Sequence, residues 1–451
     1  MTQTQRPSGD QAPSSDTSAT GVPSSAEPTS DEQGRGEQVS GEQDAGEQGA
    51  GEQDAGELGG VWDVVVVGAG PAGASAAYEA ASSTDGNGRS PRVLLLDKAA
   101  PPRYKTCGGG IIGPSRDALP PGFVLPLKDR VHAITFALDG RYQRTRRSKR
   151  MLFGLVNRDE FDQRLVQCAE KAGAVLATGV TVTGVRQNDD ESVVLTLQDG
   201  RAVRALAVVG ADGSAGRIGA HVGVSFDQVD LGLEAEIPVP PEVAAVWRGR
   251  VLLDWGGAVP GSYGWVFPKG HSLTVGVIAA RGQGAETRAY LKEFIARLGL
   301  SGFTPSIESG HLTRCRSEGS PLAKGRILVA GDAAGLLEPW TREGISYALR
   351  SGRLAGQWAA KLAAAPDAVD VRRQALNYAF AIKADLGEEM RIGRKLMTAF
   401  ESRPRAFHFA ALGLRPAWRA FARVTQGHTT FAGLARSHGL GRPTIDLLTR
   451  S

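Results

Sequence analysis

The sequence predicts an α/β fold with a parallel sheet, and three observations lead to that prediction. Four consecutive valines, residues 64–67, are typical of a strand buried on both faces. The glycine-rich segment 68–73 and the small residues 74–77 follow directly, which indicates a sharp turn into a helix. A second apolar segment, 92–96, then predicts a further strand. This strand–turn–helix–strand order is typical of a nucleotide-binding sheet.

The glycines of the turn have distinct roles in binding a dinucleotide. Gly68 permits the tight turn, Gly70 lets a pyrophosphate approach the backbone, and Gly73 lets the helix pack closely on the strand. The helix N-terminus offers N–H groups and a positive dipole end to the phosphates. Asp97 stands 24 residues after Gly73, about where an acid binds the ribose hydroxyls. Together with its flanking strand and helix, the motif predicts an adenine-dinucleotide site.

The first sixty residues differ in composition from the rest. They are rich in Ser, Gly, Gln, Glu, Pro and Asp, contain few apolar residues and repeat Gly-Glu-Gln. Such a segment buries too little apolar surface to offset its ordering entropy, so we expect it to be disordered. It also lacks the basic start and apolar stretch of a signal peptide.

Charge is divided unevenly between this tail and the remaining chain. The tail carries twelve acidic side chains and two arginines, which leaves 50 basic and 36 acidic side chains elsewhere, a net charge of +14 against +4 overall. A basic surface can meet nucleotide phosphates, an anionic membrane or nucleic acid, but no nucleic-acid motif is present. The basic residues between 141 and 150 fit either a solvated hairpin face or a membrane contact.

The cysteines and the hydropathy restrict the compartment. Cys107, Cys168 and Cys315 have neither a paired nor a metal-ligand spacing, which predicts no disulfide framework and no metal site and fits a reducing cytoplasm. No uninterrupted apolar stretch approaches the roughly 20 residues of a membrane span. We therefore expect a cytoplasmic protein, with contact to the inner face of the cell membrane as a further possibility.

Later segments add residues suited to holding a cofactor. Three glycines, 108–110, follow the cations Arg103 and Lys105 and mark a backbone that something approaches closely. Arg158 stands where a helix is expected to begin, after Asn157 as a possible cap. An Asp-Gly pair at 212–213 follows the apolar strand 205–209, and a Gly-Asp pair at 331–332 follows the apolar strand 326–330. Another helix is expected after Gly344.

In this order the four elements resemble the flavoprotein class that includes p-hydroxybenzoate hydroxylase, over about residues 62–360. The resemblance implies FAD, with Asp332 bonded to the ribityl chain and the helix after Gly344 directed at the flavin pyrimidine. Asp97 departs from the class by one methylene, because Glu is usual there, but it should still reach the ribose.

Within this class the chain resembles the geranylgeranyl reductase family, whose members reduce prenyl chains. Three segments carry the resemblance: Lys-Thr-Cys-Gly-Gly-Gly at 105–110, Tyr-Gly-Trp-Val-Phe-Pro-Lys-Gly at 263–270, and Pro-Trp-Thr-Arg-Glu-Gly-Ile at 339–345. Hydroxylases of the class generally lack the first two. In the third, the family commonly has Gly where this chain has Arg342, so either the backbone approaches the flavin less closely or a guanidinium lies beside the pocket.

The resemblance implies an FAD-binding Rossmann-like domain interleaved with a smaller β-sheet substrate domain, plus a helical C-terminal region. The expected boundaries are a tail at 1–60, the FAD domain at 61–230 with an interdomain hairpin near 131–157, the substrate domain at 231–322, the FAD domain again at 323–365, and helices at 366–451. The residues expected to contact FAD are Gly68, Gly70, Pro71, Ala72, Gly73, Asp97, Lys98, Cys107, Gly108, Gly109, Arg158, Val182, Asp212, Gly213, Gly331, Asp332, Gly344 and Ile345.

Saturating an unactivated alkene needs a hydride from reduced flavin and a proton, in a tunnel that excludes water and offers aromatic faces to developing positive charge. Tyr263 and Trp265 alternate along a strand and should share a face, which Phe267 continues and Pro268 ends. By resemblance this strand lines the substrate pocket; an ordinary aromatic core strand is the alternative. Cys107 is a candidate for proton delivery or substrate positioning, or a mere spacer, and the sequence does not identify the general acid.

The region after about residue 370 is expected to be helical and to lack cofactor motifs. Its aromatic and basic amphipathic stretch, 405–424, fits either a cover packed on the flavin domain or a surface helix dipping into the bilayer. The histidines at 408, 428 and 438 show no metal-ligand spacing and are expected to be structural or exposed.

The sequence thus predicts an FAD-dependent reductase of a prenyl lipid, with a menaquinone tail or a geranylgeranyl group as substrate. NADPH or a ferredoxin-type donor would supply electrons transiently, since no second dinucleotide fingerprint is present. A flavin monooxygenase or halogenase is the alternative, because halogenases of the class carry Trp-x-Trp-x-Ile-Pro, close to the segment 263–268. A flavin-binding scaffold is a third reading, disfavoured by the intact set of cofactor motifs.

Overall fold

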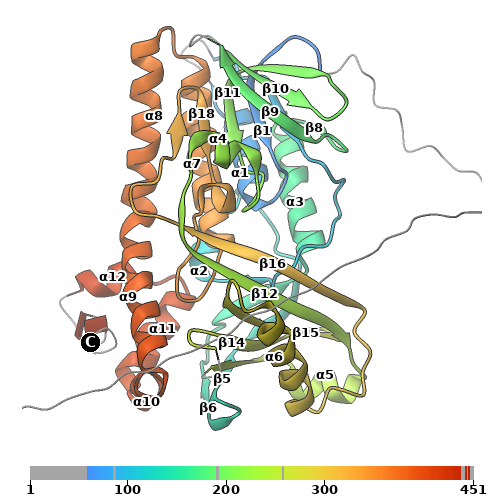
Figure 1. Ribbon diagram of the computed structural model, residues 1–451, viewed down its shortest axis with the longest axis vertical. Coiled ribbons are helices and arrows are strands. Elements are labelled where there is room, and N and C mark those ends of the chain that lie inside the picture. The colour runs from blue at the N-terminus through green and yellow to red at the C-terminus, as the bar shows by residue number, and fades with distance from the viewer. Residues whose placement is uncertain are drawn as a thin grey trace, which may run out of the picture. The chain divides into compact units, whose positions relative to one another are not determined.

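The computed structural model describes residues 58–84, 88–188, 192–255, 259–437, 442–443 and 445–446, and Figure 1 shows how their helices and strands are arranged. The acidic segment predicted to be disordered lies outside the described residues except for its last three.

The first sheet has eight strands and is parallel at its centre. β1 (Val61–Val67) lies between β11 (Ala202–Gly210) and β2 (Val93–Leu96), and β18 (Ile327–Val329) pairs with the other edge of β11. The run of valines in β1 is buried, as the sequence predicts for a central parallel strand. The remaining strands are β8 (Val175–Ala177), β9 (Val182–Asn188), β10 (Ser192–Leu197) and β17 (Ala323–Lys324), and β10 lies between β11 and β9.

Four helices accompany this sheet: α1 (Pro71–Ala81), α3 (Arg158–Lys171), α4 (Arg217–Val222) and α7 (Ile345–Ala363). α1 and α7 pack with their backbones close together. A Cβ atom at Gly352 would lie 2.2 Å from the carbonyl oxygen of Ala72, and one at Gly356 would lie 2.3 Å from that of Ala76. The small residues at the start of α1 therefore allow α7, which comes much later in the chain, to lie directly against it.

The second sheet has seven strands in the order β16-β12-β15-β14-β13-β5-β6. Their bounds are β5 (Ala133–Leu138), β6 (Arg141–Arg147), β12 (Phe226–Pro238), β13 (Arg250–Trp255), β14 (Tyr263–Lys269), β15 (Ser272–Ala280) and β16 (Ile307–Arg316). The early hairpin β5–β6 joins this sheet because β5 pairs in parallel with β13. The chain also forms α5 (Pro241–Trp247) and α6 (Gly284–Arg297) in this part.

A third, small sheet contains β3 (Gly110–Ile111), β4 (Leu127–Val131) and β7 (Phe153–Val156), with α2 (Gly113–Asp117) after β3. The mixed sheets and the helical end of the chain confirm the predicted α/β fold class. The domain boundaries given above remain predictions.

One prediction about the second sheet is wrong. Pro268 does not end its strand, because β14 continues to Lys269 and Pro268 pairs with Leu273 of β15. Pairing between β13 and β14 stops at Val266. Beyond that residue the missing N–H of proline interrupts no ladder on the β13 side, so the strand tolerates it.

The C-terminal helices form a long run and a compact cluster. α8 (Ala368–Ile382), a π-helical turn (Lys383–Gly387) and α9 (Glu388–Ser402) follow one another without a break (Figure 1). The last helices are α10 (Pro404–Gly413), α11 (Arg415–Thr425) and α12 (Phe431–Arg436). α9 to α12 share a hydrophobic core with β5 and β13, which includes Trp255, Phe400 and Phe407. Among the described residues, no helix has the length and apolar character needed to cross a membrane.

Candidate active site

One cavity of about 990 Å³ contains nearly all the residues expected at the site. Its wall includes the turn after β1, the 97–110 segment, the start of α3, β14, β16 and the loop that leads into α7. Tyr263 and Trp265 line it, as do all the residues expected to contact FAD except Gly73 and Gly331. These two glycines are packed against neighbouring backbone or side chains: Cβ atoms there would lie 1.7 Å from the Gly68 carbonyl oxygen and 2.8 Å from the Ala72 Cβ.

The turn after β1 has the geometry that its glycines predict. Gly68 has a φ of +102°, and a Cβ atom there would lie 2.3 Å from the carbonyl oxygen of Ala211. Gly70 opens toward Arg103, whose guanidinium would lie 3.5 Å from a Cβ atom at Gly70. α1 has no side chain that caps its N-terminus. Its N-terminus and a nearby guanidinium therefore face the cavity where a pyrophosphate would lie.

Asp97 braces this turn as well as lining the cavity. Its Oδ2 accepts a 2.6 Å hydrogen bond from the backbone N–H of Ala69, and its Oδ1 accepts one of 2.9 Å from Ala99. Each carboxylate oxygen has a second lone pair, so the same group can also accept from ribose hydroxyls. The shorter side chain in place of Glu is thus held directly against the glycine turn.

Two further acids present oxygens suited to hydroxyl groups. Asp212 accepts at Oδ2 from the N–H of Ile218, while its buried Oδ1 has no partner among the described residues. The Oδ2 of Asp332 lies 3.6 Å from Nε2 of His311. The same His311 nitrogen lies 2.9 Å from Nζ of Lys105. Burial opposes ionisation, but His311 and Lys105 outweigh it and hold the pKa of Asp332 below its ordinary value. The residues present therefore fit the hydroxyl-rich FAD.

Arg158 is fixed in place at the start of α3. Its guanidinium makes two 2.8 Å bonds to the carboxylate of Asp162, and both side chains are buried. Asn157 occupies the N-cap position, although its side chain makes no capping hydrogen bond. The rigid pair presents Arg158 to the cavity beside Cys107, and its contact with FAD stays a prediction.

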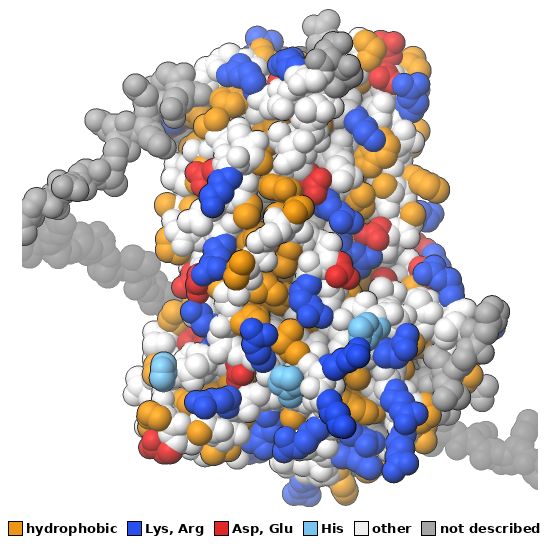
Figure 2. Space-filling model, turned by 180° about the vertical axis from the view of Figure 1, so that it is seen from behind, with side chains coloured by type: hydrophobic (Ala, Val, Ile, Leu, Met, Phe, Trp, Pro, Cys, Tyr) orange, Lys and Arg blue, Asp and Glu red, His pale blue; other side chains and the backbone are white. Residues whose placement is uncertain are grey.

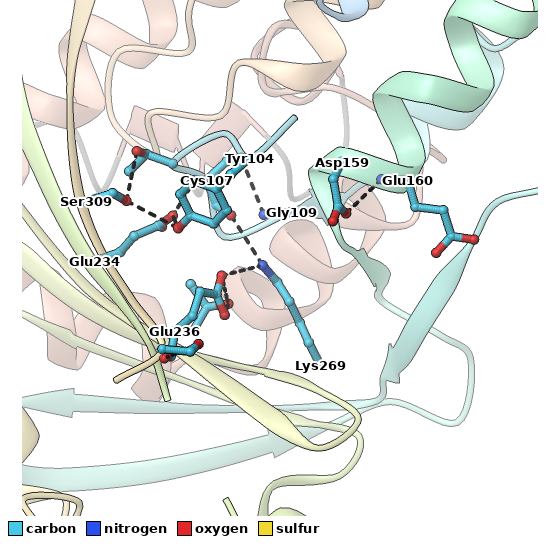
Figure 3. Close-up of polar contacts among 12 residues, drawn as sticks. Tyr104, Cys107, Gly109, Asp159, Glu160, Glu234, Glu236, Lys269 and Ser309 are labelled. Carbon is cyan, nitrogen blue, oxygen red and sulfur yellow. Dashed lines mark hydrogen bonds and ion pairs between the residues drawn. The ribbon is translucent and has the colours of Figure 1, made fainter. Parts of the chain in front are cut away.

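The Cys107 loop is tied to the second sheet by buried charges (Figure 3). Glu234 of β12 accepts hydrogen bonds at Oε1 from the Cys107 N–H, at 2.7 Å, and from the Tyr104 hydroxyl, at 2.8 Å. Lys269 of β14 donates to the Cys107 carbonyl at 3.4 Å and to Glu236 at 3.2 Å. The thiol of Cys107 accepts from the Gly109 N–H at 3.4 Å. The loop therefore holds its cysteine in a set position at the cavity wall.

The glycines of this loop are required by close packing. Gly109 has a φ of +75°, and a Cβ atom there would lie 2.1 Å from the carbonyl oxygen of Val156. A Cβ atom at Gly108 would lie 2.6 Å from the ring of Phe267. The Cys-Gly-Gly-Gly loop and the aromatic strand, two of the three segments that carry the family resemblance, are thus in direct contact.

β14 presents an aromatic wall to the cavity. The rings of Tyr263 and Trp265 lie 6.0 Å apart on one face, and Phe267 continues it beside Phe153, at 6.2 Å. The Tyr263 hydroxyl donates to the Thr341 carbonyl at 2.5 Å. The wall is completed by residues from distant segments, namely Phe136, Leu253, Trp255, Trp340, Phe400, Phe421, Val424 and Phe431.

Arg342 shows how this chain accommodates its departure from the family pattern. Its φ is +55°, the left-handed conformation that glycine adopts without strain. Its buried guanidinium lies beside the pocket, 3.1 Å from Asp230 and 5.7 Å above the ring of Tyr263, and donates to the Trp340 carbonyl at 2.8 Å. Asp230 balances the charge, so the pocket gains a fixed guanidinium without a net charge.

The C-terminal helices contribute to the cavity wall, which the sequence left open. Phe421, Val424 and Thr425 of α11 line the cavity, whereas Arg415 and Arg419 of the same helix are exposed. His408 is buried between the indole N–H of Trp255, which donates to it at 3.0 Å, and the Tyr142 carbonyl, at 3.0 Å. His408 is therefore structural, as expected.

Sequence reasoning missed several polar residues of the wall, among them Glu234, His311, Glu338 and Glu343. Glu234 and His311 stand on long strands whose alternation gave no sign of a site. Glu338 and Glu343 lie in or beside the Pro-Trp-Thr-Arg-Glu-Gly-Ile segment, which was singled out only for its arginine and glycine. Burial raises the pKa of Glu234 and of both loop glutamates.

The comparisons with known proteins agree with this geometry. A family model described as an FAD binding domain matches residues 127–365. A digeranylgeranylglycerophospholipid reductase of Methanocaldococcus jannaschii is 31% identical over 327 residues, which cover 67% of this chain and 78% of that protein. A menaquinone reductase of Mycobacterium tuberculosis is 31% identical over 317 residues, which cover 65% of this chain and 76% of that protein.

Solved structures share the fold. A geranylgeranyl bacteriochlorophyll reductase-like protein of Thermoplasma acidophilum superimposes with a TM-score of 0.65 at 20% identity and covers 86% of this chain and 99% of its own. A flavin-dependent brominase superimposes with a TM-score of 0.62 at 15% identity, covering 86% of this chain and 98% of its own, so the fold alone does not separate the two chemistries.

The fold and the cavity define an FAD-dependent oxidoreductase. The 31% sequence identity to reductases of prenyl compounds, over 317–327 residues, then identifies the family within this class. The chain belongs to the geranylgeranyl reductase family.

Proposed function

We propose that this protein saturates isoprenoid C=C bonds in a prenyl lipid, either the tail of a menaquinone or a geranylgeranyl group. One observation carries the proposal: the polar wall that fits FAD and the aromatic wall of β14 line the same cavity. An apolar chain in the aromatic part would therefore lie next to the cofactor. The names of the relatives, which include a geranylgeranyl diphosphate reductase of Rhodobacter capsulatus, support this substrate class.

The wall residues have separate tasks in this proposal. Bound FAD, once reduced, supplies the hydride. The apolar side chains exclude water, and the faces of Tyr263 and Trp265 stabilise positive charge that develops on the alkene. Asp97, Asp212 and Asp332 would hold the ribose and ribityl hydroxyls, and the N-terminus of α1 with Arg103 would hold the pyrophosphate. The Cys107 thiol is a candidate for proton delivery or for positioning the prenyl chain.

The test is an anaerobic turnover of the FAD-loaded protein, reduced chemically, with menaquinone and separately with geranylgeranyl diphosphate. We expect one molecule of hydrogen to be added for each bond saturated, as measured by mass spectrometry of the extracted lipid. Adding NADPH or a reduced ferredoxin to oxidised protein identifies the donor, because only the competent donor bleaches the flavin.

A monooxygenase or halogenase is the second candidate, favoured by the Tyr-x-Trp-x-Phe-Pro segment and by the shared fold. The same protein is therefore also incubated in air with halide and aromatic acceptors. Incorporation of oxygen or halogen without any saturation of a prenyl chain would replace the reductase proposal with this one.

We also propose that the protein contacts an anionic membrane through a basic face made by β6 and α11. Figure 2 shows basic side chains gathered at the end that carries these elements. Arg144 and Arg147 of β6 and Arg415, Arg419 and Arg423 of α11 are exposed. Beside them the rings of Tyr142 and Phe409, which are 64% and 54% exposed, pack together at 5.7 Å. Cations around exposed aromatic rings suit a lipid headgroup region.

The other face of α11 lines the cavity, so this contact would bring a membrane lipid close to the site. Co-sedimentation with anionic vesicles tests the proposal. We expect binding that weakens with added salt and with zwitterionic lipid, and a loss of binding when Arg415, Arg419 and Arg423 are all replaced by Glu. Equal binding by this variant would exclude the face.

A further inference from the structure

Two glutamates of the loop before α7 form an acid pair at the cavity wall. The backbone N–H of Glu338 donates to the Glu343 carbonyl at 3.0 Å, which closes the loop and brings the two residues together. Both line the cavity. Glu338 is 4% exposed, and its side chain is packed against α9, where a Cβ atom at Gly393 would lie 2.2 Å from the Glu338 Oε1.

Each carboxyl group has one oxygen with partners and one without. Glu338 accepts at Oε2 from the N–H and the hydroxyl of Thr341, and its Oε1 has no partner among the described residues. Glu343 accepts at Oε1 from the Ser346 N–H at 2.7 Å, and its Oε2 likewise has no partner there. A proton on the carboxyl oxygen that lacks an N–H partner makes that oxygen a hydrogen-bond donor, while the other oxygen still accepts. Each glutamate is therefore suited to the protonated form.

Two hydroxyl groups in the same wall are also unsatisfied within the described part of the chain. They are the Ser346 Oγ and the Tyr347 hydroxyl, on residues that are 1% and 3% exposed, and both residues line the cavity. Buried polar groups are normally hydrogen-bonded. Four such atoms in one short segment therefore point to a chain of water or substrate contacts there.

The charges around the pair do not neutralise it. Arg350 of α7 is engaged by Asp385 of the π-helical turn at 3.0 and 2.8 Å, and Arg342 is engaged by Asp230. Glu389 of α9 adds a further negative charge near Tyr347. Burial, and then the charge of Glu338, raise the pKa of Glu343 to about 7. The neighbours therefore favour retention of a proton by the pair near neutral pH.

The pair also lies between the two parts of the predicted reaction site. Thr341, which donates to Glu338, accepts the hydroxyl of Tyr263 from the aromatic wall. Glu343 is followed by Gly344 and α7, where the flavin pyrimidine is expected. The pair is thus linked through Thr341 to the aromatic wall, and through Gly344 to the position expected for the cofactor.

We propose that Glu343 is the general acid of the alkene reduction and that Glu338 is a positioning residue that keeps it protonated. The inference rests on the proposed prenyl reduction. One alkene carbon takes the hydride supplied by the reduced cofactor. The other takes the carboxyl proton of Glu343, so that a C–H bond forms, the O–H bond breaks and a carboxylate remains. Water restores that proton by way of the Ser346 and Tyr347 hydroxyls, and NADPH or a ferredoxin-type donor restores the two electrons.

The main test is Glu343→Gln in the FAD-loaded full chain, because glutamine keeps an oxygen for the Ser346 N–H but has no acid proton. We expect unchanged FAD content. The rate of single-turnover saturation should fall by at least about 100-fold. Glu160→Gln, at a surface carboxylate of α3 paired with Lys128 and Arg164, is the matched control and should behave as wild type. A rate within a few fold of wild type for Glu343→Gln, or a comparable loss only in Cys107→Ser, would overturn the proposal.

Two readouts separate proton donation from a structural role. In wild type the saturation rate should fall as pH rises through the pKa of Glu343, and Glu338→Gln should move this fall to lower pH because it removes the neighbouring negative charge. Infrared spectra of the substrate-free FAD-loaded protein should contain a protonated carboxyl band that is missing in Glu343→Gln. An unmoved pH profile, an unchanged band, or a flavin potential that shifts enough in Glu343→Gln to account for the slower rate would each refute the assignment.

The infrared test needs no substrate, so it judges the acid pair even if no prenyl lipid is reduced. Failure of the wild-type protein to saturate any prenyl chain would count against the proposed function, whereas a missing carboxyl band would count against the acid pair alone.

Discussion

Replacing Gly276 by alanine would press a methyl group against the ring of Trp265. Gly276 lies on β15 directly opposite Trp265 of β14. The added Cβ atom would lie 2.1 Å from Cζ2 and 2.5 Å from Cε2 of that ring, whereas Cβ atoms essentially never approach other atoms within 3.0 Å. The ring would therefore have to move by at least about 0.9 Å, the difference between 3.0 and 2.1 Å.

The consequence depends on where the ring can go. In a filled core, overpacking of this kind costs about 1–3 kcal/mol of stability. Trp265 borders the cavity, so its ring can yield into the space proposed for the prenyl chain. A displacement of about 1 Å in a positioned group can lower a rate about 100-fold. We therefore expect a large fall in turnover with a small change in Tm and no loss of FAD.

The assay compares single-turnover saturation, FAD content and Tm for Gly276→Ala and Gly302→Ala. Gly302 is the control because a Cβ atom there would meet nothing within 4 Å and its φ is not left-handed. Unchanged turnover in Gly276→Ala would show that the Trp265 ring does not shape the substrate wall. Loss of FAD from the same variant would show that the aromatic and cofactor walls are not independent.

Asp332→Ala should weaken FAD binding about 10-fold to 100-fold, because it removes a carboxylate expected to accept from the ribityl hydroxyls; fluorescence titration of the apoprotein measures this, and an unchanged Kd would contradict that role. Asp230→Ala should lower the free energy of unfolding by about 3–5 kcal/mol, because it leaves Arg342 buried without its partner. Adding Arg342→Gly should restore most of that loss in denaturant titrations, since glycine adopts the φ of +55° without strain, and no recovery would refute this account. Burial lowers the pKa of His408. The stability that neutral His408 contributes is therefore complete above the unfolded-state pKa of about 6.5 and is lost as pH falls through the lower folded-state pKa. His408→Gln, which can keep both hydrogen bonds, should flatten the dependence of the free energy of unfolding on pH in this range, and an unaltered slope would exclude His408 as its source.

The sequence could predict those parts of the site whose side chains and backbone conformation depend only on residues close together in the chain. A strand of valines, a turn that only glycine permits at Gly68, and a helix that begins at Pro71 are fixed by residues adjacent in the chain. Short motifs around Arg158, Asp212 and Asp332 were readable for the same reason, and the fold places them on one cavity wall. Their contacts with FAD stay predictions that the Asp332 variant begins to test.

What could not be read from the sequence depends on contacts between distant segments. The role of Glu234 exists only because the Cys107 loop lies against β12. Pro268 was expected to end a strand, but whether a proline interrupts a ladder depends on where the neighbouring strand stops pairing. Phe421 and Phe431 reach the cavity because the last helices pack on β5 and β13, and an amphipathic pattern alone cannot say which surface its apolar face will meet.

The order in which the cavity wall is encoded has a consequence for biosynthesis. The glycine turn leaves the ribosome early, but β18, Asp332 and α7 are among the late segments of the chain, and β18 must still pair with β11. A nascent chain that lacks them has an incomplete central sheet and no residue at the place expected for the ribityl chain or the pyrimidine. FAD capture should therefore wait until these late segments have been synthesised, and chains that end before about residue 345 should emerge without cofactor however much FAD the cell contains.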